Sequence, residues 1–125
     1  MKLLTKDQIL KVDDMKMEIV EIPEWGGSVN VKMMTAQERD AFDLNVAYID
    51  DEKERAQNFR SRLAVATTCD EKGKLLFKVE EAGELGKKSA KAVSRIFDVS
   101  KRLNAIGDAE IEEIEKNLPE TPSAD

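Results

Sequence analysis

Histidine is absent from this sequence of 125 residues, and cysteine occurs only once, as Cys69. Without an imidazole there can be no Ser–His or Cys–His catalysis, no histidine-liganded metal and no histidine switch near physiological pH. A single cysteine cannot form an internal disulfide, and it lacks the paired spacing of a zinc site. We therefore expect no cofactor and no enzymatic activity, and we expect a protein that acts by binding.

Long hydrophobic runs are also missing. No segment approaches the roughly 20 apolar residues that span a bilayer, so we expect no membrane-spanning helix and no membrane partner. The first apolar residues are followed at once by polar Thr5, Lys6 and Asp7, which leaves no signal-peptide core and predicts a cytoplasmic protein. Hydrophobic residues make up 41% of the chain and charged residues 37%, as expected for one small globular domain.

The negative charge is concentrated at one end of the chain. The formal net charge is -6, and residues 108–125 alone contain seven acidic side chains against Lys116. Residues 1–107 are therefore nearly neutral, without the concentrated positive charge on which sequence-independent nucleic-acid binding depends. We expect no nucleic-acid partner, and we expect residues 108–125 to form an acidic C-terminal helix and a disordered tail.

The N-terminal third combines a helix signal with a hairpin signal. Thr5 and Gln8 have the spacing of a capping box, which predicts a helix from Lys6 to about Val12. Apolar and polar residues alternate over 28–33, as in a strand with one buried face. Residues 18–22 are rich in β-branched side chains, and a proline and two glycines lie between the two segments. Residues 17–34 therefore predict an antiparallel hairpin.

The rest of the chain predicts helices. A second capping box at Thr35 and Glu38 begins one helix over 36–49, and Asp50 and Asp51 precede another over 52–68. A short helix over 79–85 is ended by Gly86, and the longest runs over 87–106 with an apolar residue every three or four positions. We expect an α+β fold for residues 1–107, mainly α, with a small N-terminal β-hairpin in a compact helical domain of about five helices.

The helix predicted over 36–49 has apolar residues on two sides. They are Phe42, Val46 and Ile49 on one side and Ala41, Leu44 and Tyr48 on the other. A surface helix needs only one apolar stripe, so the second stripe either binds a partner or a second copy, or packs beneath the hairpin or the first helix. Both interpretations stay open.

Two further features are candidates for protein binding. Trp25 lies in the predicted turn, where it can anchor a partner or, as we favour, fold back over the end of the core. A basic row follows one edge of the longest predicted helix: Lys88, Lys91, Arg95 and Arg102. Lys91 and Arg95 can receive an acidic partner or the acidic tail, although such rows are more often solvated and partly paired, here with Asp98.

No motif in the sequence supports catalysis or ion binding. The acidic run 50–52 lacks the regular alternation and glycine of a calcium loop, and the glycines at 83 and 86 lie too close together for a phosphate-binding loop. A small hydrolase that uses paired carboxylates is the catalytic alternative, and it requires a concave pocket with two acids in different environments. The apolar run 75–77 is expected to seal one end of the core instead.

The order of several segments resembles the tail assembly chaperones of long-tailed, siphovirus-type bacteriophages and prophages. The matching segments are LTKDQIL (4–10), IPEWGG (22–27) with Val29 and Val31, TAQERDAF (35–42), NFRSRL (58–63), DEKGKLLF (70–77), LGKKSA (85–90), RIF (95–97) and RLN (102–104). The resemblance extends over roughly residues 4–106, and it lies in the succession of the segments rather than in any one of them.

The resemblance implies a non-enzymatic helper of virion assembly. Such proteins bind the tape measure protein, a long helical chain with exposed apolar surface, while tail tube subunits polymerise around it. They are absent from the mature virion. The resemblance therefore implies the tape measure and tail tube proteins as partners, with Ala41, Leu44 and Tyr48 as a client or self-association surface. A generic intracellular adaptor domain is the alternative from the residues alone.

Overall fold

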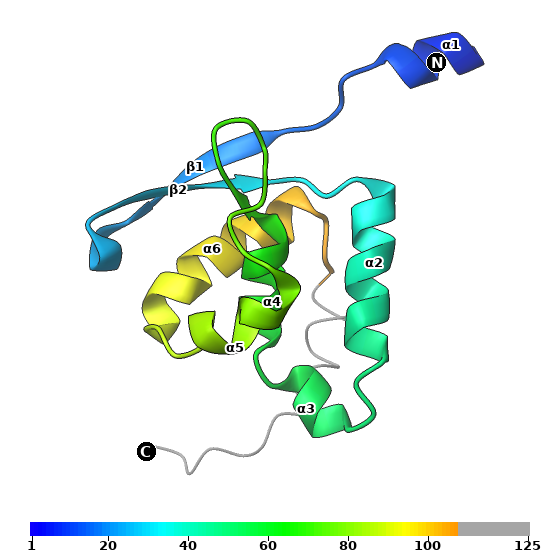
Figure 1. Cartoon of the computed structure of the whole chain (residues 1–125). Helices are drawn as coiled ribbons and strands as arrows, with labels where there is room; N and C mark the ends of the chain where they lie inside the picture. Colours follow the sequence, from blue (N-terminus) through cyan, green and yellow to red (C-terminus); the bar gives the residue numbers. More distant parts are fainter. Residues whose placement is uncertain (108–125) are drawn as a thin grey trace.

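The computed structural model describes residues 1–107, and the predicted acidic helix and tail over 108–125 lie outside the described residues. The described part is an α+β domain in which helices cover one face of a small antiparallel sheet (Figure 1). Its elements in chain order are α1 (Lys6–Lys11), β1 (Met17–Ile22), η1 (Pro23–Trp25), β2 (Gly27–Lys32), α2 (Ala36–Ala47), α3 (Glu52–Ala56), α4 (Phe59–Thr67), β3 (Thr68–Cys69), η2 (Val79–Glu81), α5 (Ala82–Leu85) and α6 (Ala90–Leu103). The predicted fold class is confirmed.

The predicted hairpin is confirmed by the pairing of β1 with β2, in which Val20 faces Val29. The turn between the two strands is the 3-10 helix η1, which ends at Gly26 in the left-handed conformation (φ 70°) that glycine adopts without steric cost. On one face, Val20, Ile22 and Val31 are buried, as the alternation of strand side chains requires.

The sheet has a third strand, β3, that the sequence did not predict. β3 pairs antiparallel with β2 through Val31 and Thr68, so the strand order is β1-β2-β3. The strand contains only two residues, which is too short to show an alternating pattern, and it follows α4 directly. The prediction of a helix up to residue 68 was therefore too long at its end.

The single helix predicted over 52–68 was wrong, because the structure divides it into α3 and α4. Asn58 between them has φ 62°, a left-handed conformation that asparagine tolerates better than most residues. Its side chain lies close to Gly86, where a Cβ would be 2.5 Å from the Asn58 Oδ1 atom. The absence of a side chain at Gly86 thus lets the α3–α4 corner approach the end of α5.

Helix α6 has the buried face that its sequence predicts. Ser89 caps its first turn by accepting a hydrogen bond from the backbone N–H of Ala92 (3.1 Å). Ala92, Val93, Ile96 and Phe97 are buried. The helix begins and ends about three residues inside the predicted 87–106, whereas η2 and α5 together match the helix predicted over 79–85.

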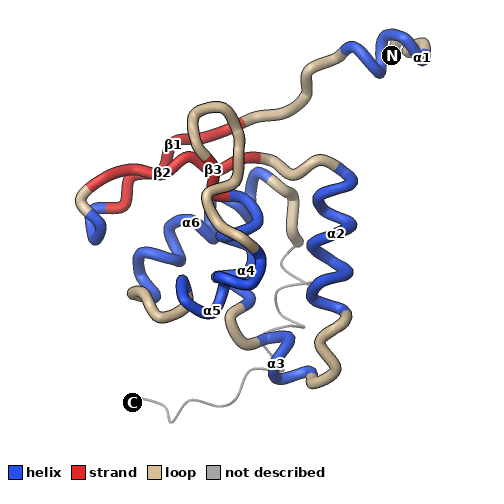
Figure 2. The backbone as a smooth tube through the Cα atoms, viewed as in Figure 1, coloured by secondary structure: helices blue, strands red, loops and turns tan. Residues whose placement is uncertain are grey.

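The core has two parts that meet at α4 and α6. One part joins the sheet to α4, α5 and α6, and includes Ile22, Val31 and Ile96, each fully buried. The other lies toward α2 and contains an aromatic row in which Phe59 contacts Phe42 and Phe97, with ring centroids 6.0 and 6.1 Å apart. The smooth backbone trace in Figure 2 shows α4 at the centre of this arrangement.

Helix α1 does not pack on this core. Its capping box forms as predicted, with Thr5 and Gln8 exchanging hydrogen bonds, but no residue of the helix is buried. Residues 1–16 are all exposed, and α1 lies apart from the rest of the fold (Figures 1 and 2). The predicted compact domain over 1–107 was therefore too large at its N-terminal end.

The C-terminal end of α6 is strained at one position. The backbone N–H of Ile106 donates to the carbonyl of Lys101 (3.0 Å) and that of Ala105 to Arg102 (3.3 Å), the pattern of a Schellman motif. This motif places Ala105 in the left-handed region at φ 51°, where a Cβ is unfavourable.

Replacing Ala105 with glycine should stabilise the domain. Relief of the left-handed strain outweighs the added freedom of the unfolded chain, so we expect the free energy of unfolding to rise by about 0.5–1 kcal/mol. Urea denaturation measures the change. Ala41→Gly in α2 is the control: the same chemical change within a helix should lower stability by about 1 kcal/mol, and an equal loss in both variants would contradict the assignment.

Candidate functional site

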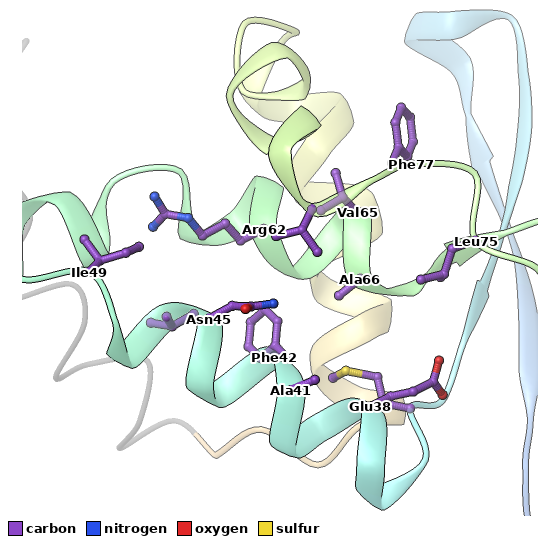
Figure 3. A pocket seen from close by; sticks show the side chains of 13 residues that line it. Glu38, Ala41, Phe42, Asn45, Ile49, Arg62, Val65, Ala66, Leu75 and Phe77 are labelled. Atoms are coloured by element: carbon purple, nitrogen blue, oxygen red, sulfur yellow. The ribbon is translucent and has the colours of Figure 1, made fainter.

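The second apolar stripe of α2 is divided between two surfaces. Leu44 and Tyr48 point to solvent, with 54% and 79% of their surfaces exposed, so they do not pack beneath the hairpin or α1. Phe42 on the opposite side is buried against the body. Ala41 lines a groove on the inner flank of the helix (Figure 3). Leu44 and Tyr48 therefore form an open apolar surface, which we call the outer α2 surface.

The groove lies between α2, α4 and the loop that leads from β3 to η2 (Figure 3). It has a volume of about 300 Å³. Most of its lining is apolar. The lining residues are Met34, Glu38, Ala41, Phe42, Asn45, Val46, Ile49, Arg62, Val65, Ala66, Leu75, Phe77 and Val79. Its size and lining suit the binding of apolar side chains.

The two charged groups that line the groove have structural partners. Glu38 accepts a hydrogen bond from Lys32 Nζ (2.9 Å) and another from the backbone N–H of Thr35, and although burial raises the pKa of its carboxyl, these bonds lower it overall. The Arg62 Nη1 atom donates to the carbonyls of Glu54 (3.0 Å) and Arg55 (2.9 Å), which fixes α3. Because both charged groups are already paired within the protein, they do not oppose the binding of apolar side chains in the groove.

The wall of the groove formed by residues 75–79 was missed at the level of the sequence. The apolar run 75–77 was expected to seal the core. Phe77 is half-buried and packs against the core, but Leu75 and Leu76 are 37% and 55% exposed. The backbone N–H of Leu76 donates to the Thr68 carbonyl (3.0 Å), which holds the returning loop beside β3. The position of this loop depends on its contact with β3, a strand that the sequence did not predict.

Trp25 lies at the tip of the hairpin, in η1. Its side chain is 39% exposed, and it is absent from both parts of the buried core. The structure therefore shows a half-covered tryptophan at a turn, rather than one enclosed at the end of the core. A partly exposed tryptophan is suited to anchoring a partner.

The basic row on α6 joins the helix to the hairpin. Arg95 donates to both carboxylate oxygens of Glu24 (2.8 and 3.0 Å), and Arg102 Nη2 donates to Glu18 (2.5 Å). The partners are thus hairpin acids and not Asp98, as the sequence suggested. Lys91 is exposed beside Glu24. Arg95 already has a carboxylate partner, whereas Lys91 presents its ammonium group to solvent.

Metal binding and cysteine chemistry have little support in residues 1–107. Within this range, no group of three or more acidic or cysteine side chains is arranged to hold a metal ion. Burial raises the pKa of the Cys69 thiol, which disfavours its reactive thiolate form. The same part of the chain contains no helix long and apolar enough to cross a membrane.

The Glu24–Arg95 pair gives a testable pH dependence. The hydrogen bond from Arg95 holds the pKa of Glu24 below its ordinary value of 4.5, so the folded state binds this proton more weakly than the unfolded state. The stabilisation is present above pH 4.5 and is lost as the pH falls through the lowered pKa.

We expect Glu24→Gln to lower the urea midpoint at neutral pH, and the two midpoints to converge in acid. Glu21→Gln, at an exposed glutamate of β1, makes the same change of charge and is the control. A pH-independent difference between wild type and Glu24→Gln would contradict the role of this ion pair.

Comparisons with known proteins agree with the arrangement of elements described above. No protein-family model and no curated protein sequence matches the chain. Among solved structures, that of the bacteriophage HK97 tail assembly chaperone is similar, with a TM-score of 0.55 and 19% sequence identity. The match covers 82% of this chain and 95% of that one. The resemblance seen in the sequence is therefore confirmed at the level of structure: the chain shares the fold of the HK97 tail assembly chaperone.

Proposed function

We propose that this chain is a tail assembly chaperone of a long-tailed bacteriophage or prophage. The observation that carries the proposal is the shared fold, because the match includes nearly the whole of the HK97 protein. Independent support comes from the succession of sequence segments over 4–106, which resembles the same family. A fold alone does not define a function, so the surfaces of the molecule must also fit the task.

The client in this proposal is the tape measure protein, which is kept from aggregating while tail tube subunits polymerise around it. A chaperone has to release its client, which favours apolar contacts of modest area over a sealed interface. The outer α2 surface fits this requirement, since Leu44 and the C-cap residue Tyr48 are both exposed at the end of α2. Trp25 offers a second anchor at the hairpin tip, with Lys91 nearby to attract an acidic segment.

The proposed activity is non-enzymatic and takes place in the cytoplasm of the host cell. The chaperone then leaves before the virion is complete. A generic adaptor domain is the alternative, since it could use the same exposed surfaces and the same fold. Gene order separates the two: a chaperone gene should lie between the genes for the major tail protein and the tape measure protein.

Charged substitutions on the outer α2 surface should abolish client binding without unfolding the domain. We expect the double variant Leu44→Asp, Tyr48→Asp to retain its helical circular dichroism, because both side chains are already solvated. Coexpression with the tape measure protein, scored by the amount of soluble client, should show at least a tenfold loss.

The double variant Met17→Asp, Ile19→Asp on β1 is the matched control. It changes two exposed apolar residues to the same charges at positions away from α2 and should rescue the client as wild type does. Equal rescue by both double variants would remove the outer α2 surface from the proposal. Failure of the wild-type chain to keep the client soluble would overturn the proposed function itself.

A further inference from the structure

The groove beside α2 is an apolar site that residues 1–107 leave open. Its floor between Phe42 and Ala66 is apolar, and Leu75 and Phe77 extend it along the returning loop (Figure 3). An engineered cavity of about 150 Å³ holds one benzene-sized group, so a groove of about 300 Å³ can hold roughly two aliphatic side chains. An apolar segment that reaches the groove gains free energy by removing this surface from water.

The described part of the chain ends beside this groove. Ile106 is buried in the same cluster as Met34 and Phe42, and both of these residues also line the groove. At about 3.3 Å per residue, residues 108–125 can extend over about 60 Å. Helix α2, with its 12 residues, is only about 18 Å long. The segment that follows Gly107 is therefore long enough to reach every part of the groove.

The sequence of this segment predicts an apolar stripe of suitable size. Ile111, Ile114 and Leu118 follow one another at intervals of three and four residues, which places them on one face of a helix. Two neighbouring side chains of the stripe would fill the groove. Most of the other residues over 108–116 are acidic, so a helix here has one apolar face and one negatively charged face.

The charges on the side of the groove opposite α2 complement this segment. Residues 60–78, which include most of α4, β3 and much of the returning loop, contain five basic side chains against two acidic ones. Lys72, Lys74 and Lys78 of this set are exposed on the loop. Helix α2 has the opposite balance, with three acidic side chains against one arginine. An acidic segment in the groove would therefore turn its charged face toward the loop and away from α2.

We propose that the acidic C-terminal segment, residues 108–118, binds in the groove of its own domain. The tether is short, so the effective concentration of the segment is in the millimolar range, and a weak contact is enough to keep the groove occupied. A partner chain that uses the groove has to displace the segment first. The segment is thus a built-in competitor, which covers apolar surface and lowers the apparent affinity of any partner for the groove.

The first test forms a disulfide between the segment and the groove in the full chain. The double variant Asn45→Cys, Glu115→Cys joins an exposed groove residue to the edge of the apolar stripe, while the native Cys69 is buried. We expect a disulfide within one chain under mild oxidation, identified by mass spectrometry of its peptides. The control Ala47→Cys, Glu115→Cys uses an exposed position of α2 that does not line the groove, and its disulfide should form about tenfold more slowly.

The second test measures hydrogen exchange at the backbone amides of residues 110–118. A segment that is docked for about nine-tenths of the time exchanges about tenfold more slowly than a free one, and wild type should show this protection. Ala41→Glu places a charge in the groove and should remove the protection. Ala41 is exposed and glutamate favours helices, so the domain should stay folded. Ala47→Glu makes the same change away from the groove and should leave the protection intact.

Three results would overturn the proposal: equal rates of disulfide formation in the two cysteine pairs, a disulfide that forms between chains instead of within one, or exchange over residues 110–118 that Ala41→Glu leaves unchanged. None of these measurements involves a client protein. A negative result here therefore leaves the proposed chaperone function to its own test.

Discussion

The burial of one face of α6 holds the sheet and the helices together. Ala92 and Ile96 on this face are fully buried, and they pack between the hairpin and α4. A two-stranded hairpin alone is marginally stable in water, so β1 and β2 depend on this contact for their structure. The loss of a buried isoleucine side chain costs about 2–5 kcal/mol, a large share of the stability of a small domain. The two arginine–glutamate pairs then fix how the hairpin lies across the helix.

Polar contacts complete the packing where α6 meets α4 and β2. Ser100 Oγ donates to Thr67 Oγ1 (2.9 Å), which in turn donates to the carbonyl of Leu63 (2.8 Å), so both buried hydroxyls are satisfied. Asn104 accepts from the backbone N–H of Met34 (2.6 Å) and so joins the end of α6 to the start of α2. These contacts stabilise the domain without α1 or the outer α2 surface, which leaves both accessible to other chains.

The elements whose apolar residues recur at regular spacing were predictable from the sequence. Those that depend on a single residue or on contacts between distant residues were not. Alternation identified the hairpin, and the three- and four-residue spacing identified α6. Nothing in the sequence marks Asn58 as a break, because asparagine is also found within helices. The partner of Arg95 is Glu24, 71 positions away, whereas sequence reasoning favours the local Asp98. Exposure of Leu44 and Tyr48 was one of two open alternatives, and only the placement of α2 decides between them.

The attachment of α2 has a consequence for what the groove can accept. At its N-terminal end, the helix is held by the Asn104 bond to Met34 and by Arg39, whose Nη1 atom donates to the Asn104 carbonyl (3.2 Å). Farther along, its main buried residue is Phe42. The wall that α2 gives to the groove is therefore attached to the core at two places, through Asn104 at the start of the helix and through Phe42 at its middle. A site whose wall is already in place loses less conformational freedom when a side chain enters it.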